Sequence, residues 1–156
     1  MEITKIATIY KTPQEFYSES VHDARLINVC GWVRFERRAK KGAMIFIDLY
    51  DGSTQQTLSV VIERTDDTSI RRTSFDLFDK FAEHSTDGAL VSLEGYVNEC
   101  KGEREQVLEL VVTTPIIIGT MPKTAVGSGV PDYPIQKSNM YHLQYLRDYP
   151  HLRFKT

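Results

Sequence analysis

Hydrophobic and polar positions alternate along the middle of the chain, and a period of two predicts β-strands. The first such segment starts at Arg25. Its apolar face carries Ile27, Val29, Val33 and Phe35, and its other face carries Trp32 and Arg34. Ala43–Asp51 and Gln56–Glu63 repeat the alternation, and Asp51-Gly52-Ser53 between them is a turn sequence. The pattern therefore predicts three adjacent antiparallel strands with short connections.

Alternation also assigns the faces of the second and third strands. In the second strand, one face carries Ile45, Ile47 and Leu49, and the opposite face carries Met44, Phe46, Asp48 and Tyr50. In the third strand we expect three side chains to be buried, Leu58, Val60 and Ile62, and three to be exposed, Thr57, Ser59 and Val61.

Residues 69–84 change to a helical period, with an apolar stripe of Ile70, Leu77, Phe78, Phe81 and Ala82. Alternation returns in a fourth strand around residues 90–96 and a fifth over Val107–Thr113, where Glu109 faces away from Leu108 and Leu110. This is the element order of the OB-fold. The predicted fold class is mostly β: a five-stranded OB-fold Greek-key barrel over residues 24–119, with one helix between strands three and four. Ferredoxin-like and other α+β topologies would need a second helix here.

Two further segments flank the predicted barrel. Residues 1–23 form a short lead-in, in which Thr12-Pro13-Gln14-Glu15 reads as a capped helix start. Residues 120–156 contain a Gly-containing linker over 125–131 and a helical run, Asn139–Tyr149, that Ser138 caps and Pro150 ends. Because this run cannot bury its apolar residues alone, we expect it to lead into a further domain.

Composition narrows the functional classes. The chain has 156 residues, is 41% hydrophobic and carries a net charge of −2, so phosphate affinity requires a local basic patch. Apolar runs are too short to cross a membrane. The N-terminus has neither a secretory h-region nor an arginine-rich leader, which predicts a cytoplasmic protein. Cys30 and Cys100 are expected to be reduced thiols, and the four scattered histidines predict no metal site.

The basic stretch lies at the end of the first strand. It consists of Arg34, Arg37, Arg38, Lys40 and Lys41 and, with Glu36, gives residues 34–41 a net charge of +4. In an OB-fold, the loop between strands one and two and the face of strands two and three form the usual oligonucleotide site. Cations there can bind phosphates. The alternative is a solvated hairpin end.

Phe46, Asp48 and Glu109 are expected on the outward face. An exposed aromatic side chain can stack on a base, and a carboxylate can accept hydrogen bonds from base amino or imino groups. The alternatives are an aromatic ring covered by other elements and a solvated glutamate. No catalytic residue is predicted, because Gly127-Ser128-Gly129 lacks the context of a phosphate loop and no nucleophile motif is present.

The ordered motifs resemble a known family. Gly31-Trp32-Val33-Arg34, Arg37-Arg38, Phe46-Ile47-Asp48-Leu49 and Asp51-Gly52-Ser53 resemble the N-terminal anticodon-binding domain of class IIb aminoacyl-tRNA synthetases. The tail, with Tyr133-Pro134-Ile135-Gln136-Lys137 and His151-Leu152-Arg153, is similar to the segment before the catalytic domain of asparaginyl-tRNA synthetases. The resemblance covers residues 25–156.

The resemblance implies roles for individual positions. Phe46 matches the aromatic residue that stacks on an anticodon base, Glu109 matches the glutamate that reads the anticodon, and Arg34 and Arg38 match cations that contact the anticodon loop. Ser59 stands where the family usually has Gln, so a shorter side chain meets the central base. The tail also departs from the family at Ser138-Asn139-Met140-Tyr141.

The resemblance further implies a larger parent protein. Its class II catalytic motifs, with ATP and Mg²⁺, are expected beyond Thr156, so whether this chain is an enzyme stays open and no cofactor is expected within it. The expected partner is tRNA, most specifically tRNA-Asn, and the parent is expected to be a homodimer. Two alternatives are the same domain of an aspartyl-tRNA synthetase and a stand-alone OB-fold single-strand or tRNA-binding protein.

Overall fold

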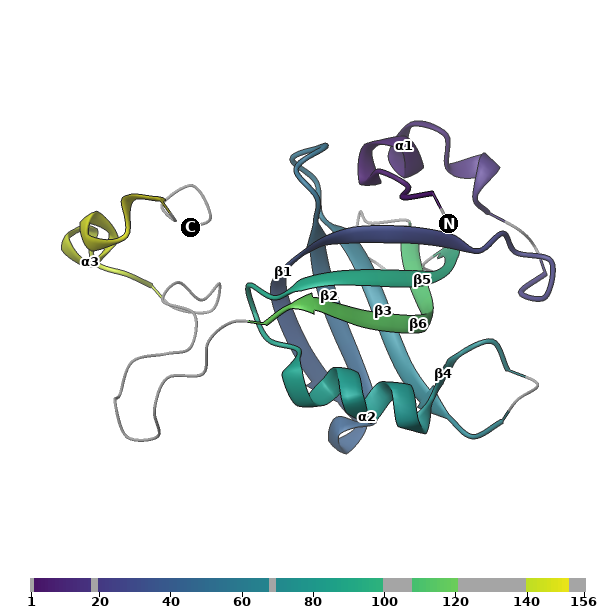
Figure 1. Cartoon of the computed structure of the whole chain (residues 1–156). Helices are drawn as coiled ribbons and strands as arrows, with labels where there is room; N and C mark the ends of the chain where they lie inside the picture. Colours follow the sequence, from purple (N-terminus) through teal and green to yellow (C-terminus); the bar gives the residue numbers. More distant parts are fainter. Residues whose placement is uncertain (1, 18–19, 68–69, 100–107, 121–139, 152–156) are drawn as a thin grey trace. The chain divides into compact units, whose positions relative to one another are not determined.

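The computed structural model describes residues 2–17, 20–67, 70–99, 108–120 and 140–151. Five strands close into a barrel (Figure 1): β1 (Ile27–Ala39), β2 (Met44–Tyr50), β3 (Leu58–Thr65), β5 (Leu90–Glu99) and β6 (Leu108–Gly119). β1 pairs antiparallel with both β2 and β5, and β6 pairs antiparallel with β5. β3 closes the barrel by pairing antiparallel with β2 and parallel with β6. The predicted OB-fold is confirmed.

Alternation along the strands fills the interior of the barrel. In β2, the fully buried residues Ile45, Ile47 and Leu49 alternate with half-buried ones. The other strands add buried aliphatic side chains to one continuous core: Val29, Leu58, Val60, Ile62, Leu93, Leu110 and Val112. Burying such side chains contributes about 1.5–3 kcal/mol each, so the period of two in the sequence is the main determinant of this core.

The lead-in closes one end of the barrel with a helix that the sequence pattern did not predict. This helix, α1 (Ile6–Lys11), buries Ile6 and Ile9 completely in the core. The β2–β3 turn caps it, because Asp51 Oδ2 accepts a hydrogen bond from Ile6 N at 2.8 Å and Ser53 Oγ accepts one from Ala7 N at 3.0 Å. The turn sequence therefore also serves as a helix cap.

The predicted helix start at Thr12 is only a single 3₁₀ turn, η1 (Pro13–Glu15). The expected side-chain cap is absent at this turn, since Thr12 Oγ1 donates instead to the carbonyl of Thr8 in α1, at 3.2 Å. The prediction of a capping box at Thr12 was therefore wrong, and its hydroxyl is bound to the end of the preceding helix.

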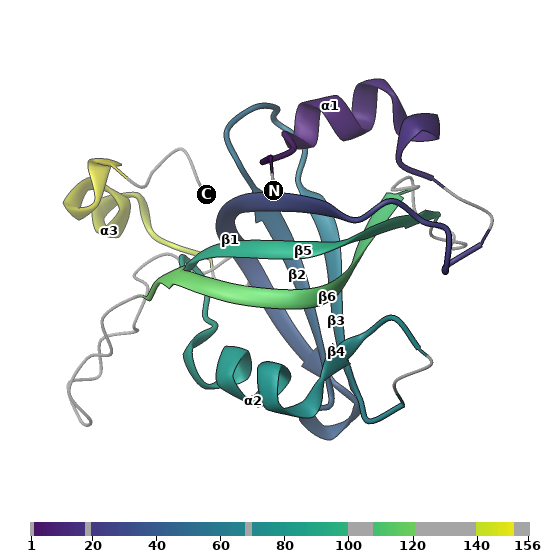
Figure 2. The same ribbon diagram turned by 45° about the vertical axis from the view of Figure 1, so that its right-hand side comes forward.

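The other end of the barrel is covered by α2 (Phe75–His84) (Figure 2). This helix buries Phe78 and Phe81. This helix starts six residues later than predicted. A two-residue strand, β4 (Thr73–Ser74), pairs with β3, and Thr73 Oγ1 donates to the carbonyl of Val112 at 2.9 Å. Ile70, expected in the apolar stripe, is 48% exposed. Tertiary pairing of residues 73–74 therefore replaces the first turn of the predicted helix.

β1 contains a bulge that reverses its faces. The register with β2 shifts between Val33 and Phe35, so that Phe35 lies opposite Asp48 and Glu36 lies opposite Ile47. The prediction that Phe35 shares the inner face with Val33 was therefore wrong. A single extra residue in one strand has this effect because side chains alternate with a period of two.

Two compact units make up the chain, residues 1–120 and 121–156. The lead-in belongs to the barrel unit. In the second unit, α3 (Leu143–Asp148) is shorter than the predicted run, and Met140 and Leu143 are exposed. Tyr145 stacks on Tyr141, with ring centroids 5.1 Å apart and an interplanar angle of 13°. The ring of Tyr149 also lies 5.1 Å from that of Tyr145 but is tilted by 49°. Desolvation, followed by the hydrogen bond and charge of Tyr149, raises the pKa of Tyr145 above its usual value.

No helix among the described residues is long and apolar enough to span a membrane. The predicted linker, Ser138 and Asn139 lie outside the described residues, as do Cys100, Val107, the tail motif Tyr133–Lys137 and residues 152–156.

Candidate nucleic-acid interface

The strand registers bring three predicted site residues into one row on the outer face of the barrel. Asp48 of β2 lies opposite Ser59 of β3, which pairs with Glu109 of β6. The full row across five strands is Phe35, Asp48, Ser59, Glu109 and Asn98. All five side chains are at least partly accessible. Residues 61 positions apart in the sequence, such as Asp48 and Glu109, thus share one small surface.

A second row runs parallel to it and contains Phe46. Its members are Arg37, Phe46, Val61, Val111 and Tyr96. The guanidinium carbon of Arg37 lies 4.7 Å from the centroid of the Phe46 ring, which is a cation–π contact. The bulge in β1 makes this contact possible, because it turns Arg37 onto the face of Phe46.

One end of the second row is closed. Tyr96 is 3% exposed, and the Arg71 guanidinium lies 5.6 Å from its ring centroid. Arg71 Nη1 also donates to the main-chain carbonyls of residues 21, 22 and 24, at 2.7, 3.0 and 3.0 Å. Val61, predicted to be exposed, is 5% exposed, so that prediction was wrong. The segment before β1 covers part of the outer face at this end, while Phe46 stays half-buried.

The basic turn between β1 and β2 has an unusual backbone. Lys40, Lys41 and Gly42 have φ values of 49°, 55° and 88°. Two consecutive non-glycine residues in the left-handed region are strained, and such strain concentrates at functional sites. Lys40 Nζ contacts Glu63 Oε1 at 2.7 Å, whereas Lys41 is exposed and forms no ion pair with a described carboxylate. The turn therefore presents the Lys41 side chain to solvent.

The two arginines nearest the bulge have different environments. Arg34 is exposed at the bulge. Arg38 is bound to the C-terminal end of α2, since its Nη2 donates to the carbonyls of Ala82 at 2.6 Å and Ser85 at 3.4 Å. Its Nε pairs with Glu36 Oε1 at 2.9 Å, and Ser85 Oγ donates to the same carboxylate. Arg38 therefore binds the C-terminal end of α2 to β1.

Sequence reasoning missed two residues of this face, Tyr96 and Asn98. The signal was present, because alternation from Leu90 onward places both on the outward side of β5. Their neighbours Val111 and Glu109, however, come from β6, and the cross-strand register is not visible in one sequence.

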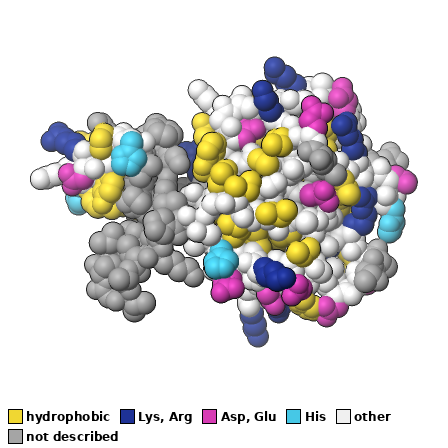
Figure 3. Space-filling model, in the orientation of Figure 1, with side chains coloured by type: hydrophobic (Ala, Val, Ile, Leu, Met, Phe, Trp, Pro, Cys, Tyr) yellow, Lys and Arg dark blue, Asp and Glu magenta, His cyan; other side chains and the backbone are white. Residues whose placement is uncertain are grey.

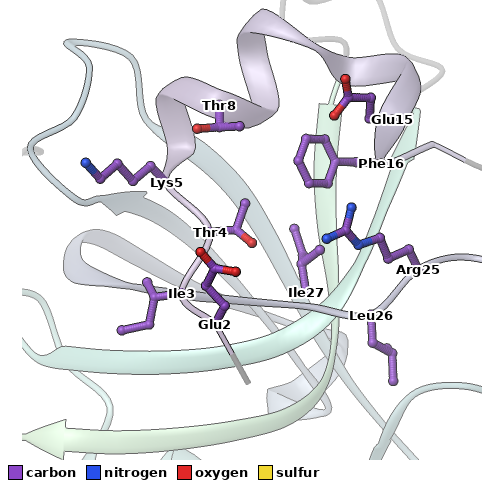
Figure 4. A pocket seen from close by; sticks show the side chains of 10 residues that line it. All are labelled: Glu2, Ile3, Thr4, Lys5, Thr8, Glu15, Phe16, Arg25, Leu26 and Ile27. Carbon is purple, nitrogen blue, oxygen red and sulfur yellow. The ribbon is translucent and has the colours of Figure 1, made fainter.

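A separate open pocket of about 500 Å³ lies between the lead-in and the start of β1 (Figure 4). Arg25 reaches toward Phe16 there, with its guanidinium carbon 5.7 Å from the ring centroid. None of the nine predicted site residues lines this pocket. We assign it no ligand.

An exposed apolar area lies along β1, β5 and β6. Figure 3 shows hydrophobic side chains across this side of the barrel, and the most exposed are Trp32 (44%), Ile116 (54%) and Ile118 (56%). Nothing in the described residues shows what covers it. The part of the chain that the structure describes also holds no group of three or more His, Cys, Asp or Glu that could bind a metal ion.

Comparison with known proteins gives a family match over most of the barrel. The model of the tRNA anticodon family, described as an OB-fold nucleic acid binding domain, matches residues 27–116. This range contains every residue of the two rows. The match therefore covers the same surface that the strand registers assemble.

Individual relatives agree with this match. The chain is 32% identical over 130 residues to an asparagine–tRNA ligase of Parabacteroides distasonis, covering 83% of this chain and 23% of the relative. Among solved structures, asparaginyl-tRNA synthetase from Pyrococcus horikoshii superposes with a TM-score of 0.57 at 22% identity, over 92% of this chain and 29% of that one. A structure assigned to an aspartyl-tRNA synthetase of Leishmania major reaches 0.67 at 14% identity, over 99% and 28%. These structures support the fold.

Proposed function

We propose a function for this chain on the premise that it belongs to the OB-fold nucleic acid binding domain family of tRNA anticodon-binding domains. Within that family it is an anticodon-binding domain of the asparaginyl-tRNA synthetase type. Its function is to bind the anticodon loop of a tRNA on the outer face of β2, β3 and β6. The chain spans about a quarter of the length of the curated relatives it matches.

The observation that carries this proposal is the convergence of Phe46, Asp48, Ser59 and Glu109 on three neighbouring strands. Phe46 supplies an aromatic surface on which an unpaired base stacks. Glu109 accepts hydrogen bonds from the base edge, and Ser59 and Asp48 lie beside it. RNA is read in this way in single-stranded loops, where bases are splayed out onto a sheet.

The cations around this face have separate parts in the proposal. Arg34, Arg37 and Lys41 contact the phosphates of the loop, because all three are exposed. Arg37 also contacts the Phe46 ring. A base that stacks on this ring must therefore either bind it together with Arg37 or displace Arg37. Arg38 and Lys40 support the site from behind, through α2 and Glu63.

The cognate RNA is proposed to be tRNA-Asn, and the parent protein is proposed to be an asparagine–tRNA ligase. Several curated relatives carry that name. In such a parent, ATP and Mg²⁺ would serve amino acid activation, and we assign no described residue of this chain to either. A homodimeric parent in the cytoplasm completes the proposal.

An aspartyl-specific domain is the second candidate. It is favoured by the fold similarity to the Leishmania major structure, and the asparagine and aspartate anticodons differ only in their third base. A stand-alone single-strand binder is the third candidate, and it would show no preference among loops.

The experiment measures binding of the 156-residue chain to anticodon stem-loops with GUU, GUC, UUU or scrambled loops at one fixed salt concentration. We expect the tightest binding to GUU. Phe46→Ala should lose about 1–3 kcal/mol of binding free energy, the value of one stacked base. Glu109→Gln should reduce discrimination among loops, because an amide presents a donor where the carboxylate accepts.

Two control variants are matched to these changes. Trp32→Ala removes an aromatic side chain that is 44% exposed. Glu94→Gln neutralises the carboxylate of a β5 residue that pairs with Thr114, in the half of β6 that does not contain Glu109. Both should bind like wild type. Tightest binding to GUC would move the assignment to the aspartyl type. Equal binding to all four loops would contradict anticodon recognition by this chain.

A further inference from the structure

One outward position of β5 carries a hydrogen-bonding side chain that the proposed function does not use. Asn98 is exposed and lies directly opposite Glu109 in the antiparallel ladder between β5 and β6. Directly opposed residues on one face have Cβ atoms about 4.5–5.5 Å apart. Asn98 therefore ends the row that runs through Asp48, Ser59 and Glu109.

The side chains of this row offer mainly hydrogen-bond acceptors and few donors. The carboxylates of Asp48 and Glu109 accept hydrogen bonds, and Ser59 donates only through a short hydroxyl side chain. The Asn98 carboxamide carries an NH₂ group with two donors, and Asn98 is the direct cross-strand neighbour of Glu109. Asn98 is thus the residue of the row that can donate to a carbonyl oxygen next to that carboxylate.

The four RNA bases differ in how well the donors and acceptors on their edges match a carboxylate beside a carboxamide. Guanine presents two adjacent donors, N1–H and N2–H₂, followed by the acceptor O6. The donors match the two oxygens of one carboxylate, and O6 then requires a donor. Adenine, cytosine and uracil each place an acceptor next to their donor group. That acceptor would face the carboxylate and be repelled.

We propose that Asn98 is a specificity-determining residue, which donates a hydrogen bond to O6 of a loop guanine whose N1–H and N2–H₂ groups are accepted by Glu109. This inference rests on the proposed function, because its ligand is an unpaired base of the bound loop. Asn98 also supplies a hydrogen-bond donor on a face where the side chain of Ser59 is short.

The test uses stem-loops in which the loop guanine is replaced by 6-thioguanine or inosine. 6-Thioguanine keeps both donors but has a weakly accepting sulfur at position 6, and inosine keeps O6 but lacks the N2 amino group. We expect Asn98→Ala to lower affinity for the guanine loop about 3- to 10-fold, the value of one neutral hydrogen bond. The same variant should leave the affinity for the 6-thioguanine loop unchanged.

The inosine loop separates Asn98 from Glu109. Loss of the N2 amino group should weaken binding by the same factor in wild type and in Asn98→Ala, since that contact belongs to Glu109. Asn98→Asp keeps the size of the side chain and replaces the donor with an acceptor beside Glu109. It should bind the guanine loop more weakly than Asn98→Ala does.

Asn28→Ala is the matched control, because it truncates an asparagine of β1 that pairs with β5 far from Glu109. It should bind all loops like wild type, and thermal unfolding verifies the fold of each variant. If Asn98→Ala loses the same affinity for the guanine and the 6-thioguanine loops, or loses none, the role of Asn98 is overturned. Selective binding of the cognate loop by the wild-type chain would still support the proposed function in that case. Equal wild-type binding to cognate and scrambled loops would overturn both.

Discussion

At the scale of single residues, two glycines of the barrel differ sharply in the space around them. A Cβ atom on Gly95 would lie 2.1 Å from the main-chain oxygen of Val111 in β6. This is far inside van der Waals contact, and backbone cannot move aside as a flexible side chain can. A Cβ atom on Gly119 would meet only the Cβ of Leu90, at 3.6 Å. Gly95 is thus required for the approach of β5 to β6.

Gly95→Ala is predicted to lower the free energy of unfolding by about 1–3 kcal/mol, because the strands must separate to admit the methyl group. Gly119→Ala is the matched control and should change it by less than about 0.5 kcal/mol. Urea denaturation followed by circular dichroism measures both. Equal stabilities of the two variants would show that the close approach at Gly95 is absent in solution.

At the scale of elements, α1 is an integral part of the barrel although it lies outside the five strands. Ile6 and Ile9 are fully buried in the same core as the strands. The Tyr10 hydroxyl donates to the carbonyl of Thr57 at 2.8 Å, just before β3. A six-residue helix is unstable alone, so these contacts and the cap at Asp51 stabilise it.

Ile9→Ala is predicted to destabilise the barrel by about 2–5 kcal/mol, the cost of a cavity in a packed core. Ile3→Ala, at a position that is 57% exposed in the same lead-in, should cost much less. Chemical denaturation of both variants is the measurement. If Ile9→Ala unfolds at the wild-type denaturant concentration, the lead-in is not packed on the barrel as described.

At the scale of the whole molecule, a net charge of −2 means that RNA affinity depends on a few local cations. Arg34, Arg37 and Lys41 are exposed and form no ion pair with a described carboxylate. Each phosphate contact on a single strand contributes about 0.7 to the slope of log K against log salt concentration. The whole chain is therefore expected to bind its loop with a shallow salt dependence.

We predict a slope of about −2 for the wild-type chain, and Lys41→Ala should reduce its magnitude by about 0.7. Lys40→Ala is the matched control on the neighbouring residue and should change the slope less, because Lys40 is paired with Glu63. Binding titrations between low and physiological salt give the slopes. A larger effect of Lys40→Ala than of Lys41→Ala would contradict the assignment of the two lysines.

Some features of this protein follow from the sequence alone. Alternation placed Ile45, Ile47 and Leu49 in the core and Phe46 and Asp48 on the other face, since the period of a strand is a local property. The order of strands and helix indicated the OB-fold, and the ordered motifs indicated the family. The sequence did not predict α1, because a helix of six residues is stabilised mainly by what it packs against.

Other features were decided only by tertiary structure. The bulge after Val33 turned Arg37 toward Phe46 and Arg38 toward α2, although both arginines belong to one basic run in the sequence. Pairing of β5 with β6 set Asn98 beside Glu109. Bulges and registers depend on contacts between residues far apart in the chain. A period of two gives the face of a side chain within its own strand, but only the pairing of strands determines its neighbours.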